Sequence, residues 1–421
     1  MDVVVTGGGP SGMMAAARAA ERGCRVTLLE KNPSLGKKLL LTGGGRCNFT
    51  NAEPDNQRLA AFYGKKGRYL LSPFSRFSSQ DALNFFKSRG MGYKVEDRNR
   101  AFPASDSSEA VLRVLREYLE ETRVRVVTHC EVTSLKASLG QIVRVETRKG
   151  CFEAEHLILA TGGTSLPATG STGDGYRWLA ELGHRVRIPE PSLVPLAVRE
   201  SWIKDLAGLA FPQVRLQAWG PSGQLASDSG KLLLTHFGLS GPLVLNLATT
   251  LQSAHRELAA SGNSLELRLD FFPSVDAGQL DRDLLENFRQ GPNRLTKTAL
   301  AGLLPPRLVS RVLILAGLDG ETPLYRLTKA ERRRVVEVLK AFPLTFEKLM
   351  DASRAVVTSG GVSLDEVDFK TMKSRIIPNL SIVGDLLDFE RPTGGFSLQI
   401  CWATAWSAGS AFEPSQNVES S

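Results

Sequence analysis

The residues near the N-terminus with the clearest chemical meaning are glycines. The run GGGPSG places Gly7, Gly9 and Gly12 between a short β-branched run at Val3–Val5 and an alanine-rich helical pattern at Met13–Arg22. At this spacing the first glycine permits a tight turn, the second lets the main chain approach a pyrophosphate, and the third lets the helix pack on the strand. The amino end of the helix then offers N–H groups and a positive dipole to phosphates. The pattern predicts a dinucleotide-binding turn; the alternative is a glycine-rich turn without a ligand.

An acidic residue supports the first interpretation. Glu30 ends a second strand pattern, Arg25–Glu30, and lies eighteen residues after Gly12. An acid at this place can hold the ribose hydroxyls of the adenosine half of a dinucleotide. A 2′-phosphate would call for arginine instead, so Glu30 favours FAD or NAD over NADP at this turn.

Two later segments favour FAD over NAD. HLILATGG, residues 156–163, is a buried strand pattern ending in a small-residue turn, which is typical of flavoproteins beside the adenosine end. In the segment 383–409, Gly384 and Asp385 close a strand where the ribityl chain and pyrophosphate would lie. Gly394 and Gly395 then open the last helix, whose N–H groups would point at the flavin N1 and C2 carbonyl and stabilise the anionic reduced ring. A simple NAD dehydrogenase does not need its last helix to return to the first strand.

Elements of the α/β class must position these segments. Strand, helix and strand follow one another over the first thirty residues, which forms a βαβ unit. The character changes at PEPSLVPLAV, residues 189–198, a proline-rich crossing between domains. From there to about residue 270 the pattern is β-rich, and from about 273 to 325 it is helical and basic. RAFP, at 100–103, is expected to lie in a loop that closes over the cofactor.

Composition limits the class of protein. The 421 residues are 42% hydrophobic and 23% charged, as in a globular chain of two or three domains. The most apolar run, LVSRVLILAGL at 308–318, is too short for a membrane span and contains Arg311. The N-terminus has neither a basic region nor a long apolar run, so we expect no secretory signal. The five cysteines form no C-x-x-C pair, which argues against a disulfide framework, zinc or iron–sulfur site. We therefore expect no membrane, no metal and a cytoplasmic location.

The positive charge is concentrated in one segment. The net charge is +8, and eleven basic residues against four acids fall between Arg289 and Lys340, an excess of seven. A second basic cluster runs from Arg58 to Arg76 and contains Lys65, Lys66 and Arg68. Focused positive charge attracts polyanions such as RNA, and a solvated helix face is an equally good alternative.

A series of motifs follows in a specific order along nearly the whole chain: GGGPSG, GGGRCNFTN, RAFPASDSSEAV, ATGG, SLVPL, THFGLSGP, TSGGV and RPTGGFSLQ. In this series the chain resembles bacterial NAD(P)/FAD-dependent oxidoreductases of the aminoacetone-oxidase-like and bile-acid-reductase-like type, some members of which are ribosomal RNA dihydrouridine synthases. Two positions depart from the family pattern: Asp385, where the family usually has Glu, and Ser397, where it often has Asn.

The resemblance implies an α/β fold with a Rossmann-like FAD-binding domain in two sequence pieces. A β-rich domain and a small basic helical domain are inserted between the pieces, in agreement with the changes of pattern along the chain. The expected bounds are 1–192 and 355–413 for the FAD-binding domain, 193–271 and 326–354 for the β-rich domain, 272–325 for the helical domain, and 414–421 for a disordered tail.

The resemblance also implies roles for the loop LTGGGRCNFTN at 41–51. Gly43, Gly44 and Gly45 would let the backbone reach the flavin ring and pyrophosphate, Arg46 would add charge, and Asn48 would fix the loop. Cys47, next to Arg46, would be a general acid for a carbon that receives hydride; the alternative is a small residue packed under the flavin. His236, in a loop of the inserted domain, is the other proton-donor candidate, and its alternative is a structural histidine.

The predicted cofactor-binding set combines these segments. It consists of Gly7, Gly9, Pro10, Ser11, Gly12, Glu30, Lys31, Lys38, Gly43, Gly44, Gly45, Arg46, Asn48, Val132, Thr161, Gly162, Gly163, Gly384, Asp385, Gly394, Gly395, Phe396 and Ser397.

The reaction expected from these residues is hydride transfer. No second G-x-G-x-x-G follows a strand, so NAD(P)H would dock only transiently and reduce the flavin. Hydride from the flavin N5 would then add to an electron-poor C=C. The basic segment favours a uridine of ribosomal RNA as substrate. A conjugated enone such as a steroid, or an RNA-associated flavin-binding protein with little turnover, are the alternatives.

Overall fold

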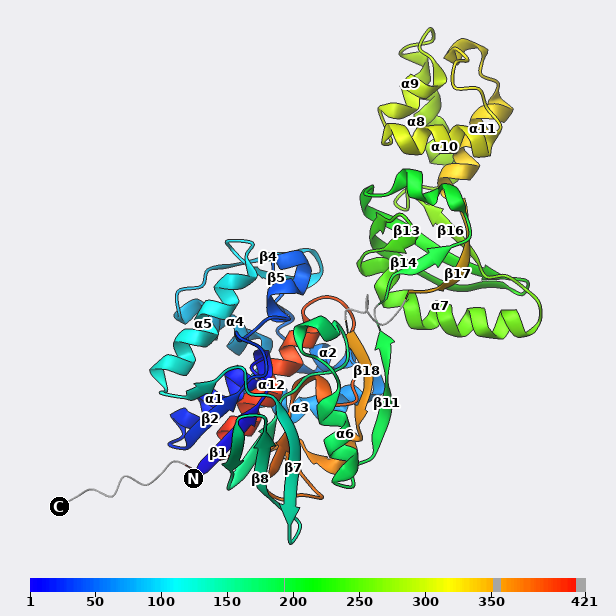
Figure 1. The fold of residues 1–421 in the computed structure, drawn as a ribbon. Coiled ribbons are helices and arrows are strands. Elements are labelled where there is room, and N and C mark those ends of the chain that lie inside the picture. Colours follow the sequence, from blue (N-terminus) through cyan, green and yellow to red (C-terminus); the bar gives the residue numbers. More distant parts are fainter. Residues whose placement is uncertain (193, 351–356, 414–421) are drawn as a thin grey trace, which may run out of the picture. The chain divides into compact units, whose positions relative to one another are not determined.

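The computed structural model describes residues 1–192, 194–350 and 357–413. The chain forms two compact units: Met1–Pro191 with Val356–Ser421 make up unit 1, and Ser192–Ala355 make up unit 2. Figure 1 shows the elements of each. The expected boundary residues 193 and 354–355 and the predicted tail 414–421 lie outside the described ranges.

The core of unit 1 is a seven-stranded sheet of the order β19-β20-β21-β10-β1-β2-β6. β6, β2, β1, β10 and β21 are parallel neighbours, whereas β20 and β19 run antiparallel at one edge. The β-branched and leucine runs of β1, β10 and β21 are buried on both faces, as central parallel strands require. The strands span Asp2–Thr6 (β1), Arg25–Leu29 (β2), Arg125–Val127 (β6), His156–Leu159 (β10), Val367–Asp368 (β19), Lys373–Ser374 (β20) and Leu380–Ile382 (β21).

The first and last helices of unit 1 lie side by side (Figure 1). In α12 (Phe396–Ser410), Gly409 faces α1 (Pro10–Glu21) so closely that a Cβ there would lie 2.8 Å from the Ala15 carbonyl oxygen. At the same crossing Arg18 Nε donates to Ser410 Oγ at 2.8 Å. The alanine-rich sequence of α1 thus serves close packing, and it brings the two sequence pieces of the unit together.

Smaller elements surround this sheet. β5 (Arg100–Pro103) is the middle strand of a three-stranded sheet with β3 (Thr50–Asn51) and β4 (Tyr93–Glu96). The expectation of a loop at RAFP was therefore wrong, because pairing on both sides holds this segment as a strand. The other elements of unit 1 are α2 (Asn56–Ala61), α3 (Leu71–Arg76), α4 (Ser79–Ser88), α5 (Ser108–Glu121), β7 (Val132–Ser138), β8 (Gln141–Thr147), β9 (Gly150–Glu153), α6 (Asp174–Glu181), β11 (Val186–Ser192), its partner β18 (Val357–Val362), and the short turns η1 (Leu39–Gly45), η2 (Gly64–Leu70), η3 (Asp97–Asn99), η4 (Pro167–Thr169), η8 (Leu364–Glu366) and η9 (Gly384–Leu386).

Unit 2 is a closed six-stranded barrel, and most of its helices lie in sequence between the last two barrel strands. The barrel has the order β12-β15-β14-β13-β16-β17, and its interior leucines share one hydrophobic cluster with the helices. Helix α11 packs against α8 and α10 and also contacts the strands β16 and β17. The elements are β12 (Leu196–Val198), η5 (Ser201–Leu206), β13 (Ala210–Gly220), β14 (Gly223–Leu234), β15 (Gly238–Ser240), α7 (Pro242–Ala260), β16 (Glu266–Asp270), α8 (Ala277–Arg289), α9 (Thr296–Ala301), α10 (Pro306–Ala316), η6 (Leu324–Arg326), α11 (Lys329–Lys340) and β17 (Phe342–Leu349).

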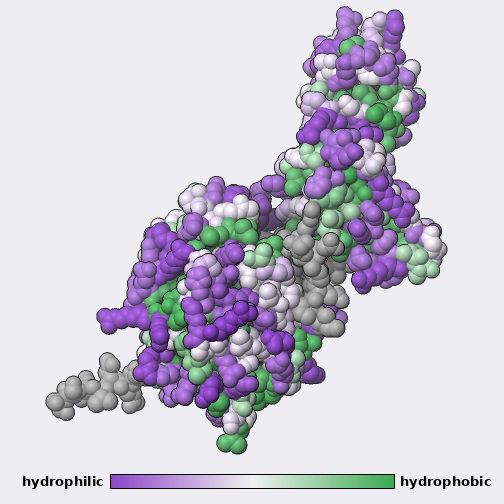
Figure 2. All heavy atoms as spheres, in the orientation of Figure 1, coloured by the Kyte–Doolittle hydropathy of each residue, from purple (hydrophilic) through white to green (hydrophobic). Residues whose placement is uncertain are grey.

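The surface is mostly hydrophilic on the face drawn in Figure 2, where hydrophobic residues form scattered patches. Among the helices of the described ranges, none combines the length and apolar composition that a membrane crossing needs. The same ranges contain no cluster of three or more His, Cys, Asp or Glu side chains that could hold a metal ion.

Candidate functional site

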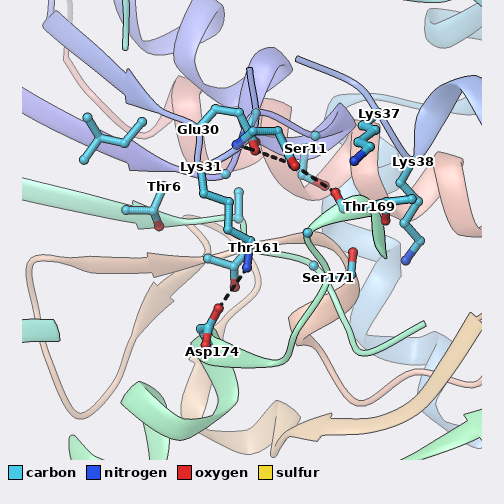
Figure 3. A pocket seen from close by; sticks show the side chains of 18 of the residues that line it. Thr6, Ser11, Glu30, Lys31, Lys37, Lys38, Thr161, Thr169, Ser171 and Asp174 are labelled. Atoms are coloured by element: carbon cyan, nitrogen blue, oxygen red, sulfur yellow. Dashed lines mark hydrogen bonds and ion pairs between the residues drawn. The ribbon is translucent and has the colours of Figure 1, made fainter. Parts of the chain in front are cut away.

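A cavity opens at the carboxyl ends of β1, β2 and β10, where doubly wound folds bind nucleotides (Figure 3). The turn after β1, the acid after β2 and the turn after β10 all contribute to its wall. The predicted residues that line it are Gly7, Gly9, Pro10, Ser11, Glu30, Lys31, Lys38, Val132, Thr161, Gly162 and Asp385.

Close packing explains the glycines of the first turn. Gly7 has φ +101°, and a Cβ on it would lie 2.5 Å from the Ala160 carbonyl oxygen. A Cβ on Gly12 would lie 1.8 Å from the Gly7 carbonyl oxygen. Gly9 differs, because a Cβ there would meet no protein atom within 4 Å and would enter the cavity. Gly7 and Gly12 therefore serve the turn itself, whereas the bare Cα of Gly9 leaves room for a ligand.

Glu30 fixes the shape of the turn from a buried position. Its Oε2 accepts from the Gly8 N–H at 2.7 Å, and its Oε1 accepts from the backbone and side-chain nitrogens of Asn32, each at 2.7 Å. A carboxylate oxygen has two lone pairs, so Oε2, which accepts one bond, keeps capacity for a ribose hydroxyl, whereas Oε1 already accepts two. The Nζ atom of the neighbouring Lys31 lies 3.0 Å from Asp174 Oδ2. Figure 3 draws this ion pair as a dashed line.

Asp385 is the acid of the last segment, and two cations flank it. Lys38 Nζ lies 3.4 Å from its Oδ2, and the fully buried Arg391 lies 3.7 Å from its Oδ1. Burial opposes ionisation, but Arg391 and Lys38 outweigh it and hold the pKa of Asp385 below its ordinary value. The carboxylate is therefore charged at neutral pH and lies in the cavity wall.

Three buried oxygens of the cavity wall accept or donate no hydrogen bond within the described part of the chain. They are Thr6 Oγ1, Thr161 Oγ1 and Asp385 Oδ1. Buried polar atoms in proteins nearly always have a partner, so these atoms indicate a ligand with several hydroxyl groups. The ribose and ribityl hydroxyls of FAD have this chemistry, and the cavity residues fit that cofactor.

The glycine-rich loop at 43–51 joins the start of the last helix. Gly395 has φ +94°, and a Cβ there would lie 2.3 Å from the carbonyl carbon of Thr50. The Asn48 amide, oriented to satisfy both of its groups, donates to the Thr50 carbonyl at 3.0 Å and accepts from the Gly395 N–H at 2.9 Å. Asn51 Nδ2 donates to the Gly394 carbonyl at 3.1 Å. These bonds bring together two motifs that lie more than 340 residues apart.

The cavity wall does not include every predicted residue of these two motifs. Gly43, Gly44 and Gly45 all have positive φ, and a Cβ on Gly44 or Gly45 would meet nothing within 4 Å. Phe396 is buried, and its carbonyl accepts from Tyr63 at 2.8 Å. The residues of the predicted set outside the cavity wall are Gly12, Gly43, Gly44, Gly45, Arg46, Asn48, Gly163, Gly384, Gly394, Gly395, Phe396 and Ser397. Their contact with a cofactor stays a prediction.

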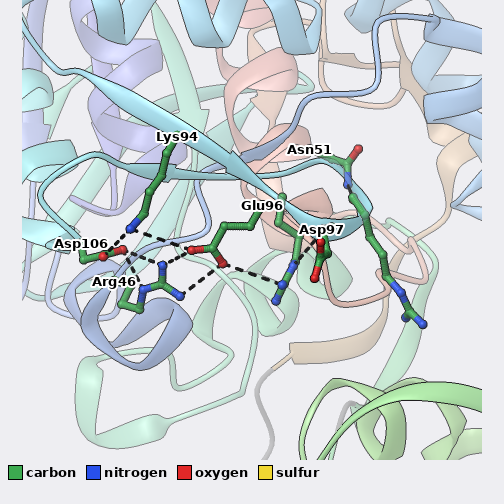
Figure 4. Close-up of polar contacts among 8 residues, drawn as sticks. Arg46, Asn51, Lys94, Glu96, Asp97 and Asp106 are labelled. Atoms are coloured by element: carbon green, nitrogen blue, oxygen red, sulfur yellow. Dashed lines mark hydrogen bonds and ion pairs between the residues drawn. The ribbon is translucent and has the colours of Figure 1, made fainter. Parts of the chain in front are cut away.

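Arg46 belongs to a surface network of charges (Figure 4). Its guanidinium bonds Glu96 and Asp106 and lies 4.2 Å from the centroid of the Phe102 ring. These two acids raise the pKa of Arg46. Lys94 bonds the same Asp106, so the network ties the glycine-rich loop to β4 and to the segment before α5.

The two proton-donor candidates have different surroundings. The Cys47 side chain is buried, and burial raises the pKa of its thiol to about 12, despite a hydrogen bond with Thr42. Its φ of +60° is unusual for a residue with a side chain. His236 lies in unit 2, between β14 and β15, with an exposed ring whose centroid is 4.9 Å from that of Phe237.

Sequence reasoning missed several residues in the cavity wall or next to it. Arg391 neutralises Asp385 although six positions separate them, and Cys401 lines the wall from α12. Burial and the Asp385 charge raise the pKa of the Cys401 thiol to about 12, and Ser11 bonds it. The GGGPSG spacing marks Ser11, but no spacing marks Arg391 or Cys401, because their roles depend on packing between distant segments.

The sequence matches a family model over residues 1–411, the HI0933-like protein Rossmann domain. It is 31% identical over 410 residues to the 3-dehydro-bile acid delta(4,6)-reductase of Clostridium scindens, covering 97% of this chain and 98% of the relative. It is 30% identical over 412 residues to the ribosomal RNA dihydrouridine synthase of Escherichia coli, covering 96% of each.

Solved structures share the fold. The 3-ketosteroid delta1-dehydrogenase of Sterolibacterium denitrificans aligns with a TM-score of 0.56 at 13% identity, over 97% of this chain and 98% of that one. The 3-ketosteroid-delta4-(5alpha)-dehydrogenase of Rhodococcus jostii aligns with a TM-score of 0.51 at 15% identity, over 97% and 96%. The predicted fold class, a Rossmann-like FAD-binding domain with a β-rich insertion, is confirmed.

Proposed function

Because the chain belongs to the HI0933-like Rossmann family and is an FAD-dependent oxidoreductase, we propose that it uses NAD(P)H to reduce a uridine of ribosomal RNA to dihydrouridine. The similarity to the Escherichia coli relative over 96% of the chain, together with the basic segment of unit 2, carries this proposal. A ribosomal RNA substrate would place the reaction in the cytoplasm.

Residues of the unit 1 cavity would hold the cofactor, which supplies hydride transfer from a nicotinamide to an electron-poor C=C. The Gly7–Gly12 turn would receive the pyrophosphate, Glu30 the adenosine ribose, and Asp385 with Thr161 the hydroxyls between the two rings. Lys38 stands beside Asp385 and would balance the phosphate charge.

The chain's own task in the reduction is to deliver a proton. Uracil is an enone-like ring, so hydride adds at C6, negative charge builds at C5, and a proton completes the new C–H bond there. The nicotinamide is oxidised to NAD(P)⁺, and the C5=C6 bond is reduced. His236 is the better candidate for the donor, because its ring is exposed, whereas Cys47 is buried with a thiol pKa of about 12.

Fewer basic residues of unit 2 are available to bind RNA than the number of basic residues in the sequence suggests. Some cations of the 289–340 segment hold the fold: Arg332 is buried against Asp281 at 2.7 Å, and Lys340 binds Asp270 at 2.7 Å. Others are exposed and form neither an ion pair nor a side-chain hydrogen bond within the described residues. These are Arg326, Lys329 and Arg333, and they are the cations that we assign to phosphate contacts.

A small conjugated enone is the second candidate substrate. The similarity to the Clostridium scindens reductase, at 31% identity, favours it. Both substrates would require the same addition of hydride to the β-carbon and a proton to the α-carbon of an enone. Only the docking surface distinguishes the two, because a steroid acid has no use for the exposed cations of unit 2.

The deciding experiment is deletion of the gene followed by mass spectrometry of ribosomal RNA. We expect one dihydrouridine to disappear and to return when the gene is restored. If every dihydrouridine persists, the RNA proposal fails. Anaerobic reoxidation of the NADPH-reduced protein by a steroid enone, and not by RNA, would establish the alternative. Reduction by NADPH with no reoxidation by either would indicate an RNA-associated protein with little turnover.

A further inference from the structure

A second cavity of unit 1 shares no lining residue with the cavity described above. It measures about 640 Å³, within the range of cavities that hold small organic ligands. Five cationic side chains and only two carboxylates, Asp365 and Asp388, line it. The cations are Lys65, Lys66, Arg68, Arg185 and Arg187.

The carboxylates neutralise only part of this charge. Asp388 binds Lys66 Nζ at 2.6 Å and lies 3.7 Å from Arg187, while Glu366 outside the cavity wall binds Arg185 at 2.6 Å. Lys65 and Arg68 are exposed, and neither forms an ion pair with any described residue. The cavity therefore keeps an excess of positive charge that is accessible from solvent.

Aromatic side chains adjoin these cations on the same stretch of chain. Tyr69 lines the cavity, and Arg68 lies 5.1 Å from the centroid of its ring. Phe62, three residues before Lys65, is 51% exposed and packs on Phe396 at the start of α12, with 4.5 Å between ring centroids. Alternation of basic and aromatic side chains is typical of surfaces that bind single-stranded nucleic acid, because phosphates and bases are contacted in turn.

Asp388 favours RNA over a compact anion. Its side chain is buried, and its Oδ1 accepts no hydrogen bond within the described ranges. A carboxylate in the wall repels a multiply charged pyrophosphate, but it can accept a hydrogen bond from a 2′-hydroxyl or a base N–H. A chain of singly charged phosphodiesters satisfies both the cations and this acceptor.

We propose that this cavity binds the sugar–phosphate backbone of a single-stranded segment of the RNA substrate. The proposal rests on the proposed function, and it assigns a docking surface to the unit that holds the flavin. The sequence expectation assigned RNA binding to the basic segment at residues 289–340 and named the cluster from Arg58 to Arg76 only as a second concentration of charge.

Charge reversal in the full-length, flavin-loaded protein tests this assignment. The variant Lys65→Glu/Arg68→Glu/Arg187→Glu removes three cations of the cavity. The matched control, Lys136→Glu/Arg144→Glu/Lys149→Glu, reverses three exposed cations of β7, β8 and the turn after β8, which contribute nothing to the cavity. Binding of a fluorescein-labelled, uridine-rich single-stranded RNA is followed by anisotropy over a range of salt concentrations.

We expect the cavity variant to bind this RNA at least about tenfold more weakly, with a salt dependence lower by about two in the log–log slope. The control should bind within about twofold of the unchanged protein. Flavin absorbance and thermal unfolding establish that each variant is folded; if the triple variant unfolds, Arg68→Glu alone should still weaken binding and reduce the slope. Unchanged affinity and slope in a folded cavity variant would overturn the proposal.

The rate of flavin reduction by NADPH separates a dinucleotide from RNA as occupant. We expect the cavity variant to be reduced at the rate of the unchanged protein. A slower reduction with full RNA affinity would assign the cavity to the nicotinamide nucleotide and overturn the RNA assignment. If the unchanged protein binds RNA through this cavity but forms no dihydrouridine, the proposed function fails and the docking surface remains. If the unchanged protein has no RNA affinity, both fail.

Discussion

The side-chain oxygen of Asn48 accepts a hydrogen bond from the Gly395 N–H at 2.9 Å, which couples the glycine-rich loop to the first turn of the last helix. Asn48→Ala removes this bond and leaves a donor without its partner. We expect a loss of about 1–3 kcal/mol in unfolding free energy and faster flavin release. Urea unfolding and the fluorescence of released flavin measure both. Asn263→Ala, at an exposed turn of unit 2, is the control and should change neither.

Gly9 and Gly12 make a pair of variants with opposite expectations. A Cβ on Gly9 meets no protein atom within 4 Å, so Gly9→Ala should leave the apoprotein as stable as before and weaken FAD binding. A Cβ on Gly12 would lie 1.8 Å from a backbone oxygen, so Gly12→Ala should destabilise the apoprotein itself. Unfolding of the apoprotein and titration with FAD distinguish the two. Full FAD affinity in Gly9→Ala would contradict the placement of the pyrophosphate.

Asp385 should contribute to the pH dependence of stability in acid. Its pKa is lower in the folded protein than the ordinary value of 3.8, because Arg391 and Lys38 outweigh the effect of burial. A depressed folded pKa stabilises the protein at pH values above the unfolded pKa, and this contribution is lost as pH falls through the folded pKa. We expect Asp385→Asn to be less stable at neutral pH and to show a flatter dependence below about pH 4. Urea unfolding midpoints of both proteins, measured across this pH range, test the direction of the effect. If the midpoint of Asp385→Asn changed with pH as steeply as that of the unchanged protein, the ion pairs of Asp385 would not contribute to stability.

In the native protein, we expect the Cys47 thiol to resist alkylation under conditions in which the Cys151 thiol reacts. Burial raises the pKa of the Cys47 thiol to about 12, whereas Cys151 is exposed. Because only the thiolate reacts, iodoacetamide at neutral pH should label Cys151 in the native protein and reach Cys47 only after unfolding. Mass spectrometry of labelled peptides reads the result directly. Rapid native labelling of Cys47 would show that its surroundings open.

Turnover rates of variants distinguish the two proton-donor candidates, Cys47 and His236. We expect Cys47→Ala to retain turnover and His236→Ala to lose about 10²- to 10⁴-fold, as for removal of a general acid. His236→Gln keeps a hydrogen-bond donor of similar size without an imidazole, so it should be as slow as His236→Ala. NADPH reduction of the flavin should be unaffected in all three. Full turnover in His236→Ala would remove His236 from the mechanism.

Local spacing predicted the elements that depend on backbone shape, and their contact with a cofactor stays a prediction. The first glycine turn, the acid after β2 and the start of α12 are properties of short segments, and the sequence marks each of them. Long-range pairing was not marked: RAFP becomes a strand because β3 and β4 pair with it, and Arg332 is a structural residue because Asp281, fifty-one positions earlier, faces it. The buried environment of Cys47 likewise results from tertiary packing, which composition and periodicity do not contain.

The order of the central sheet has a consequence for biosynthesis. β21, which begins at Leu380, is an interior strand beside β10, and α12 after it covers α1. A nascent chain that has emerged only as far as unit 2 therefore exposes one flank of β10 and the apolar side of α1 to the cellular milieu. Until synthesis has nearly finished, the cavity wall also lacks Asp385 and Cys401, so we expect the nascent chain to hold the cofactor less tightly than the finished protein.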